Sequence, residues 1–183
     1  MKKDLGSVLG LYPTPLVVAG AMVEGKPNWV LVGHVGIIGH DRIMVSLAKP
    51  HYTNQGIREN RVLSVNVVDE QMLSKADYVG CVSGSKTDKS QVFSYTIGSE
   101  GAPLIEESKL SMECVVDDIY ETETFDNFIL KIAHTYAEET ILNEKGKLDY
   151  GKFKPILFEM PGYTYLKTGE TAAKCMTLGK EQR

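Results

Sequence analysis

The chain has 183 residues, of which 43% are hydrophobic and 24% are charged, and its formal net charge is −4. This length and composition fit a single globular domain spanning residues 1–183 with a substantial buried core. The negative net charge argues against a nucleic-acid-binding surface and against a polybasic membrane contact. No apolar run approaches the roughly 20 residues that a membrane-spanning helix needs.

The N-terminal residues and the cysteines bear on the compartment. The apolar residues after the first six are interrupted by Tyr12-Pro13-Thr14-Pro15, so no secretory signal is predicted and a cytoplasmic protein is expected. Cys81, Cys114 and Cys175 are odd in number and far apart, which favours neither a disulfide framework nor a metal site. Each is expected to be a small buried or half-buried apolar side chain.

The apolar segments predict a mainly β protein. Residues 16–23 and 29–35 flank the polar turn Glu24-Gly25-Lys26-Pro27, a pattern typical of a β-hairpin. Further strands are predicted at 43–49, 62–68, 110–120, 128–136 and 156–158. Mostly antiparallel strands with two short helices favour a barrel over a doubly wound sheet.

The two short helices are each preceded by a residue that commonly caps helices. Thr53 is the expected N-cap of the first helix, with Tyr52 packing onto Ile57. Asp69 is the expected cap of the second helix, which should end near Gly80.

The segment Lys49-Pro50-His51-Tyr52-Thr53 joins a predicted strand to the first helix. Free N–H groups at a helix start attract anions, and Lys49, His51 and the Thr53 hydroxyl can add charge and hydrogen bonds for a phosphomonoester. The alternative is that Thr53 only caps the helix while Lys49 is solvated. The residues alone favour this alternative, because helix caps greatly outnumber phosphate sites.

Two glycines lie in the segment from Asn28 to Gly36, which contains the strand predicted at 29–35. Glycine inside a strand is costly unless backbone approaches another group closely, as the planar ring of a flavin would require. Gly33 and Gly36 would allow that approach, but a bulge at a barrel corner explains them equally well. Trp29 is either a core side chain or a wall beside such a ring, and the residues alone favour the core.

The polar loop from Ser83 to Ser90 carries Lys86 and Lys89 among several hydroxyls. These groups could reach the ribityl chain or the pyrimidine edge of a flavin, where a cation stabilises the reduced anion. A solvated loop is the favoured interpretation from the residues alone.

No metal site and no catalytic residue are assigned from the sequence. His34, His40 and His51 lie close together along the chain, but no carboxylate or cysteine spacing supports them as ligands. No nucleophile elbow, dinucleotide-type or Walker-type glycine loop is present.

Taken together, the motifs resemble the flavin reductase-like, FMN-binding split-barrel family and its flavoredoxin-like branch. The resemblance follows the chain in order over nearly its whole length. It rests on Tyr12-Pro13-Thr14-Pro15, the stretch from Asn28 to Gly36, the stretch from Lys49 to Thr53, Val65-Asn66-Val67, Ser83-Gly84 with Asp88-Lys89, Ala102-Pro103-Leu104-Ile105, Met112-Glu113-Cys114 and Pro161-Gly162-Tyr163.

The resemblance implies a Greek-key split β-barrel that forms a homodimer, with FMN bound non-covalently near the interface; FAD is a less compatible alternative. Backbone from Val32 to Val35 would face the ring, the stretch from Lys49 to Thr53 would hold the phosphate, and Asp88 and Lys89 would approach the ring. The cofactor-binding residues expected on this basis are Asn28, Trp29, Val32, Gly33, His34, Val35, Ser46, Ala48, Lys49, His51, Tyr52, Thr53, Asn66, Ser83, Asp88 and Lys89.

Two departures from the family pattern bear on the electron donor. Leu31 and Val32 stand where many members carry a hydroxyl side chain, so backbone contacts would carry more of the flavin binding. Phe125 stands where reductases commonly place a histidine near the nicotinamide, which weakens the case for efficient NAD(P)H use.

The sequence therefore predicts an FMN-dependent oxidoreductase that passes hydride or electrons through its flavin, with NAD(P)H as one candidate donor. The alternative is an FMN electron-transfer module that is reduced by a protein partner and turns over no small molecule. A barrel that no longer binds flavin is a third possibility, which the presence of Lys49 and Thr53 disfavours.

Overall fold

The structure, a computed structural model, describes residues 1–179. Two α-helices, α1 (Thr53–Asn60) and α2 (Leu73–Cys81), and one 3-10 turn, η1 (Glu139–Ile141), accompany twelve strands. The strands are β1 (Thr14–Pro15), β2 (Val17–Val23), β3 (Lys26–Val32), β4 (Val35–Ile37), β5 (Arg42–Ala48), β6 (Val62–Val67), β7 (Tyr95–Ile97), β8 (Pro103–Ile105), β9 (Leu110–Glu121), β10 (Phe125–Ala137), β11 (Ile156–Glu159) and β12 (Thr164–Lys167).

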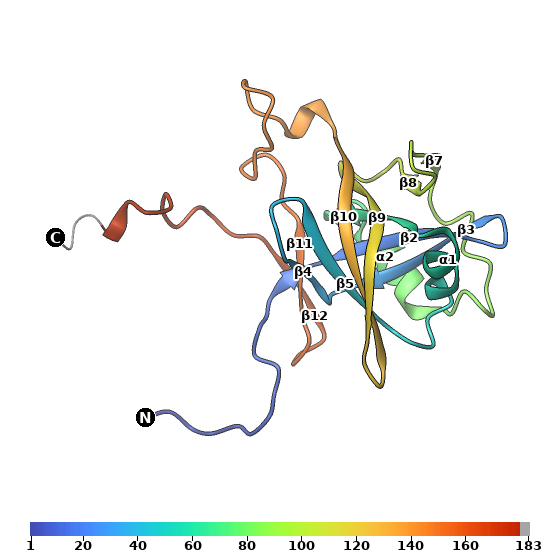
Figure 1. The fold of residues 1–183 in the computed structure, drawn as a ribbon. Helices are drawn as coiled ribbons and strands as arrows, with labels where there is room; N and C mark the ends of the chain where they lie inside the picture. The colour runs from blue at the N-terminus through green and yellow to red at the C-terminus, as the bar shows by residue number, and fades with distance from the viewer. Residues whose placement is uncertain (180–183) are drawn as a thin grey trace.

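Seven strands form one curled sheet in the order β3-β2-β6-β9-β10-β5-β4, which makes a half-barrel (Figure 1). Its pairings are antiparallel throughout. A three-stranded sheet, β1-β11-β12, and the pair β7-β8 lie beside it. The predicted mainly β split-barrel fold with short helices is confirmed.

Strand β2 is buried on both faces, and this explains its unbroken apolar sequence. Val17 and Ala19 belong to the cluster inside the curled sheet, whereas Val18 belongs to a second cluster on the other face. Ala76 and Val79 of α2 pack in that second cluster. Alternate side chains of a strand point to opposite faces, so a strand covered on both sides needs apolar residues at every position.

Several predicted boundaries differ from the structure. The strand expected at 29–35 is divided into β3, which ends at Val32, and the short edge strand β4, which begins at Val35. A side chain at Gly33 would overlap the Phe158 ring, so Phe158 packs directly on the backbone where the two strands separate. The strands β7, β8 and β12 and the early start of β10 at Phe125 were not predicted, because they are short or partly polar.

The predicted cap of α1 is wrong, and that of α2 is only partly right. Tyr52 occupies the N-cap position of α1 and Thr53 is its first residue, since the Thr53 hydroxyl is hydrogen-bonded to Asn28 instead. Asp69 accepts hydrogen bonds from the N–H groups of Gln71 and Met72, so it folds the turn that precedes α2 rather than capping the helix itself.

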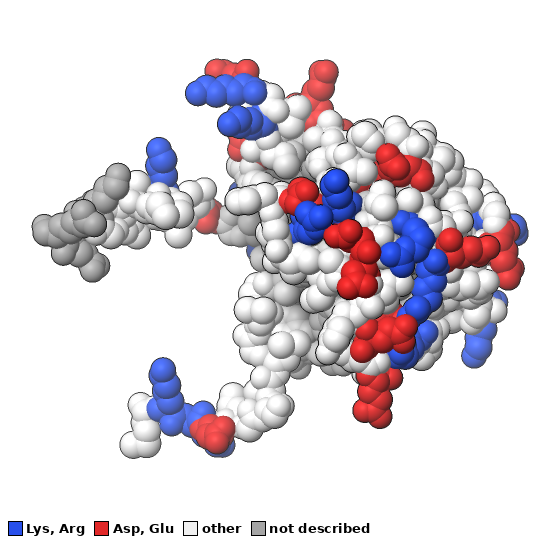
Figure 2. Space-filling view, in the orientation of Figure 1, with Lys and Arg blue, Asp and Glu red and all other residues white. Residues whose placement is uncertain are grey.

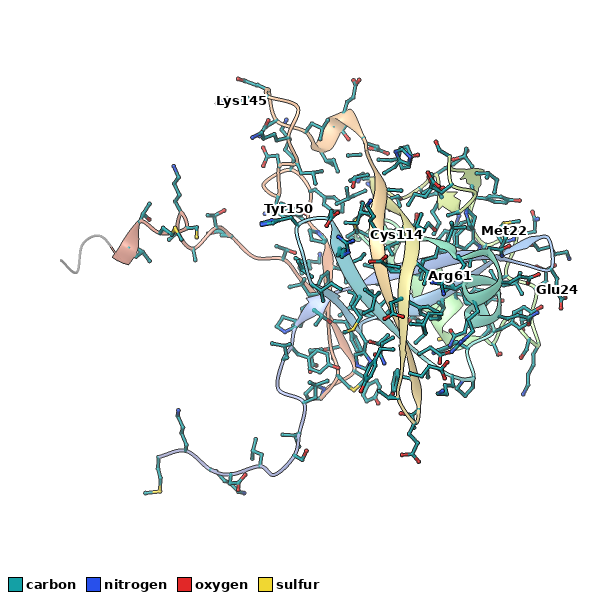
Figure 3. The ribbon with its side chains drawn as sticks, in the orientation of Figure 1. Met22, Glu24, Arg61, Cys114, Lys145 and Tyr150 are labelled. Atoms are coloured by element: carbon teal, nitrogen blue, oxygen red, sulfur yellow. The ribbon has the colours of Figure 1, made fainter. Side chains whose placement is uncertain are left out.

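The expectation that all three cysteines are buried or half-buried is also wrong for two of them. Cys114 is buried in the body of the molecule, as Figure 3 shows, whereas Cys81 and Cys175 are exposed. Cys81 ends α2 at the surface, and Cys175 lies in the C-terminal arm. Burial and the neighbouring Glu113 raise the pKa of Cys114 to about 12, so its thiol is protonated and inert at neutral pH.

The two ends of the chain extend away from the sheets, to the left in Figure 1. Several large apolar side chains on them are exposed, among them Leu9, Leu11 and Met176. Among residues 1–179, no helix has the length and apolar character needed to cross a membrane.

Candidate functional site

Three cavities that share lining residues adjoin one another along β3, the start of α1 and the loop after α2, and together they are called the groove. The polar cavity, of about 270 Å³, is lined by residues that include Asn28, His51, Thr53 and Lys89. The loop cavity, of about 320 Å³, shares Asn28 and Lys89 with it and extends along residues 84–89. The apolar cavity, of about 220 Å³, shares Leu31 and His51 with the polar cavity and extends to residue 160.

Thr53 is positioned in the polar cavity by a buried hydrogen bond. The Asn28 amide donates to its hydroxyl oxygen over 2.7 Å, which joins β3 to the start of α1. Both side chains are almost fully buried from solvent. Because the Thr53 oxygen accepts this bond, its own O–H is left to donate to a ligand in the cavity.

The first N–H groups of α1 also face no protein acceptor. Among residues 1–179, the backbone N–H groups of Tyr52 and Thr53 donate to no backbone or side-chain oxygen. Both residues line the polar cavity. The free N–H groups at a helix start carry partial positive charge and bind anions such as phosphate.

Lys89 is a buried cation in the wall of the same cavity. Its ammonium donates to the carbonyl oxygens of Val79 and Val82, at 3.0 and 3.1 Å, and so caps the C-terminal end of α2. Burial lowers the pKa of Lys89 to about 8. The third ammonium proton has no acceptor among residues 1–179, so it can be donated to an anion.

His51 lies where the polar and apolar cavities meet. Its side chain has solvent-exposed surface at the rim, yet the protein atoms packed around its ring lower its pKa, and the Lys89 charge lowers it further. The neutral imidazole can then donate or accept a hydrogen bond without adding charge.

The apolar cavity is lined mainly by aromatic and aliphatic side chains. Phe125, at the start of β10, and Phe158, on β11, bound it together with Leu31 and Met160. His34 also lines it and packs beside Phe125, with ring centroids 5.7 Å apart. Such a wall suits a planar, largely apolar ring.

The structure gathers many of the predicted residues in this groove. Asn28, His51, Tyr52, Thr53, Ser83 and Lys89 line the polar cavity, Asp88 lines the loop cavity, and Val32, Gly33, His34, Ser46 and Ala48 line the apolar cavity. Asp88 is ion-paired with Lys26 over 2.8 Å. A planar ring was expected to lie close to the backbone at Gly33, and in the structure the Phe158 side chain occupies that position.

Four predicted residues lie elsewhere. Trp29 is fully buried beside Phe93, because the outer face of β3 is covered by α2. Asn66 is buried and bonded to the backbone of Val18, so it fixes the sheet rather than the site. Val35 packs against the barrel core.

Lys49 is the fourth, and it does not line the groove. Its ammonium lies 2.9 Å from Glu121 and 3.6 Å from Asp126, on the far side of the turn. These two carboxylates also hold Arg58 of α1. A lysine engaged by two carboxylates is a poor candidate for a phosphate ligand.

The sequence did not single out Leu31, Phe158 and Met160 as groove residues. Phe158 and Met160 come from the far end of the chain, and β11 is held near the groove by its pairing with β1 and by backbone hydrogen bonds to Leu16 and Val68. No local signal in the sequence reports that contact.

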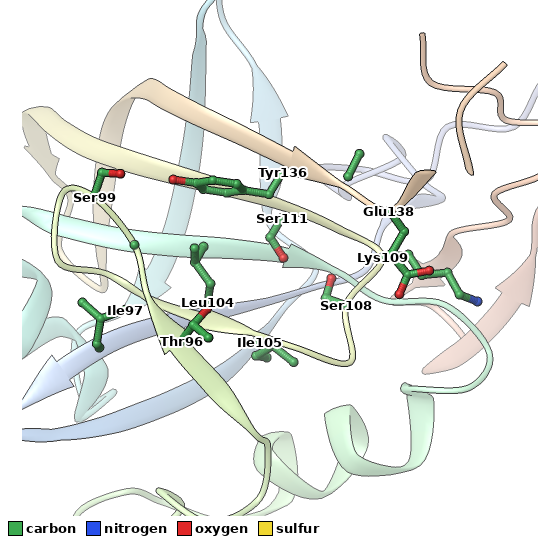
Figure 4. A pocket seen from close by; sticks show the side chains of 12 residues that line it. Thr96, Ile97, Ser99, Leu104, Ile105, Ser108, Lys109, Ser111, Tyr136 and Glu138 are labelled. Atoms are coloured by element: carbon green, nitrogen blue, oxygen red, sulfur yellow. The ribbon is translucent and has the colours of Figure 1, made fainter. Parts of the chain in front are cut away.

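Another cavity lies away from the groove, at the start of β9 and the end of β10 (Figure 4). It has a volume of about 490 Å³ and is lined by residues that include Thr96, Ser111 and Tyr136. None of the predicted site residues lines it. Within residues 1–179, no three His, Cys, Asp or Glu side chains gather as a metal site.

Acidic and basic side chains are interleaved over the face shown in Figure 2. This face therefore offers no extended single-sign surface of the kind that nucleic acids bind.

Comparisons with known proteins show which family this chain is similar to. A model of the flavin reductase like domain matches residues 9–165. A search among curated proteins finds no match. Flavoredoxin from Methanosarcina acetivorans is 36% identical, covers 100% of both chains and superposes with a TM-score of 0.95.

Two further solved structures are similar. Flavoredoxin of Desulfovibrio vulgaris (Miyazaki F) is 30% identical over 98% of this chain and 100% of its own, with a TM-score of 0.90. An FMN-binding protein from Thermus thermophilus, 22% identical over 95% of this chain and 97% of its own, shares the fold with a TM-score of 0.81. The chain therefore belongs to the flavin reductase-like domain family.

Proposed function

We propose that the groove binds FMN, with the phosphate in the polar cavity and the ring directed to the apolar cavity. The observation that carries this proposal is the meeting of three anion-binding features in the polar cavity, which adjoins both the loop cavity and the apolar cavity. These are the Lys89 ammonium, the Thr53 hydroxyl and the free N–H groups at the start of α1. The adjoining apolar cavity is lined mainly by aromatic and aliphatic side chains, as a flavin ring requires.

The proposal moves the cationic phosphate ligand from Lys49 to Lys89. Lys89 lines the polar cavity, whereas Lys49 is engaged by Glu121 and Asp126. A single terminal phosphate suits the polar cavity, which favours FMN over FAD. When bound, FMN supplies the redox chemistry, and the protein contributes binding, orientation and electrostatics.

Within this function we favour an electron-transfer role over efficient NAD(P)H oxidation. Phe125 lines the apolar cavity at the point where reductases of the family commonly carry a histidine. Similarity to two proteins named flavoredoxin supports this choice and suggests a redox protein partner.

A homodimer is part of the proposal. Leu5, Val8, Leu9 and Leu11 of the N-terminal arm and Leu178 of the C-terminal arm are exposed large apolar side chains. A second copy of the chain would cover such arms. Sedimentation at micromolar concentration should give the mass of two chains, and the mass of one chain would contradict this part.

The FMN site is tested by substitutions at Thr53. Thr53→Val keeps the side-chain volume but removes the hydroxyl, and the loss of one hydrogen bond to a charged group should weaken FMN binding by about 2 kcal/mol, or roughly 30-fold. Thr53→Ser keeps the hydroxyl and should bind FMN nearly as tightly as the wild type. Flavin fluorescence titration measures both. Equal affinities of the two variants would mean that the phosphate lies elsewhere.

A further inference from the structure

The side chain of His34 is held at the wall of the apolar cavity by the N-terminal arm. Its Nε2 lies 2.9 Å from the Tyr12 hydroxyl, and the same hydroxyl lies 3.6 Å from Met160 Sδ, a weaker acceptor than the imidazole nitrogen. Tyr12 is fixed in turn by edge-on packing against Phe158, with ring centroids 6.1 Å apart. Nδ1 of His34 has no hydrogen-bond partner among residues 1–179, which leaves this nitrogen to a ligand in the cavity.

The backbone around His34 is also fixed. The carbonyl of His34 accepts from the Ser46 N–H at 2.9 Å, and the carbonyl of Gly33 accepts from the Thr14 hydroxyl at 2.7 Å. The imidazole is therefore held from its backbone and from its ring. Groups that exchange protons with a ligand need such fixed geometry.

A flavin needs a proton source when it receives electrons singly. Hydride transfer delivers hydrogen together with its electron pair, whereas a protein donor delivers electrons alone, so the reduced ring must take a proton from its surroundings. Most side chains lining the apolar cavity, such as Leu31, Phe125 and Phe158, carry no exchangeable proton.

His34 and His51 are the titratable side chains that line this cavity. The atoms around His51 and the charge of Lys89 lower the pKa of His51, which favours its neutral ring at neutral pH. His51 also has no side-chain hydrogen bond in the described part of the chain that could return a proton to it. His34 has such a partner in Tyr12.

We propose that His34 passes one proton from Nδ1 to the bound flavin for each electron pair that a one-electron donor delivers. Tyr12 acts as the positioning residue and returns a proton to Nε2. In this step the Nδ1–H bond of His34 breaks and an N–H bond forms on the flavin, which gains two electrons and one proton. Nε2 takes the Tyr12 hydroxyl proton as the Nδ1–H bond breaks, so the ring stays neutral, and a solvent acid (hydronium or a buffer acid) returns a proton to the Tyr12 phenolate. The inference rests on the proposed function.

The test compares His34→Gln and Tyr12→Phe with two matched controls, all loaded with FMN. His40→Gln changes a histidine that lines none of the three groove cavities. Tyr163→Phe changes an exposed tyrosine that, like Tyr12, packs against Phe158. Dithionite serves as the one-electron donor, and anaerobic stopped-flow absorbance follows the loss of the oxidised flavin.

His34→Gln should slow flavin reduction by about 100-fold, the usual effect of losing a positioned proton donor. Tyr12→Phe should slow it less, and the two controls should react at the wild-type rate. The wild-type rate should fall in D₂O, since a proton moves in the step. Equal rates for His34→Gln and His40→Gln, with FMN bound to both, would overturn the inference.

A second readout needs no flavin. ¹⁵N NMR of the flavin-free protein reports which His34 nitrogen carries the proton, and Tyr12→Phe should change that tautomer while Tyr163→Phe should not. An unchanged tautomer would show that Tyr12 does not position the ring. If His34→Gln no longer holds FMN, a wild-type reduction rate in Tyr12→Phe overturns the inference. A wild-type protein that binds no FMN overturns the proposed function itself.

Discussion

The Asn28 amide determines the direction in which the Thr53 hydroxyl can donate. Because Asn28 donates to the oxygen of Thr53, the hydroxyl proton is free for the polar cavity. Lys89 is arranged by the same logic, since two carbonyls of the α2 end hold its ammonium at the cavity wall. In both cases the protein holds a hydrogen-bond donor in place and leaves one of its protons without an acceptor among residues 1–179, so that proton can bind a ligand.

The pKa of Lys89 makes FMN affinity dependent on pH. Burial lowers this pKa to about 8, so Lys89 is charged below pH 8 and becomes neutral as the pH rises through that value. The dianionic phosphate prefers the charged form, so affinity should fall between pH 7 and pH 9.5. The fall is roughly tenfold if bound phosphate raises the pKa of Lys89 by about one unit.

Fluorescence titrations across this pH range measure the effect. The pKa of His51 is lowered and that of Tyr52 is raised, so neither group should titrate within it. Lys89→Met should bind FMN more weakly and without this pH dependence. A pH-independent affinity in the wild type would show that Lys89 does not face the phosphate.

The sequence indicated most of the residues that line the groove, but it did not distinguish the surroundings of the two lysines. Thr53 and His51 follow a strand and begin a helix, and that local order is visible in the sequence. Whether Lys49 or Lys89 reaches the cavity depends on Glu121 and on the end of α2, and these are distant contacts. Charged side chains are placed by partners that local patterns do not reveal.

At the scale of elements, α1 lies so close to β2 that only glycine fits between them. A Cβ at Gly56 would overlap the backbone oxygen of Met22. This contact sets the height of the helix over the sheet and thereby the position of its first N–H groups. Helix α1 is thus held at its start by Thr53 on β3 and near its middle by Gly56 on β2.

Gly56→Ala should therefore destabilise the protein, although alanine is the better helix former. The overlap is with backbone, which cannot move aside cheaply, and we expect a loss of about 2 kcal/mol in the free energy of unfolding. Gly36→Ala is the matched control, because nothing lies within 4 Å of a Cβ there, and it should change stability by less than about 0.5 kcal/mol. Urea unfolding measures both, and equal stabilities would contradict the close contact.

The sequence predicted strands correctly where apolar residues recur with a regular spacing along the chain. β6 and the β2–β3 hairpin were expected and are present within a few residues. The edge strands β4 and β12 were not predicted, because their pairing partners, rather than their own apolar pattern, define them. For the same reason, the contribution of β11 to the groove had no signal in the sequence.

At the scale of the whole molecule, the curled sheet brings several segments that are distant in the sequence to one groove. β3 lines the polar and apolar cavities, the start of α1 and the loop after α2 line the polar cavity, and β10 and β11 line the apolar cavity. A split barrel lets these segments meet because its sheet is open between β3 and β4.

The most direct test of this account is an equilibrium titration of the purified wild-type protein with FMN, with riboflavin as the comparison ligand. We predict saturable binding of one FMN per chain and much weaker binding of riboflavin, because riboflavin lacks the phosphate that the polar cavity would hold. Equal affinity for the two flavins would contradict the phosphate site. No binding of either flavin would contradict the proposal that the groove binds FMN.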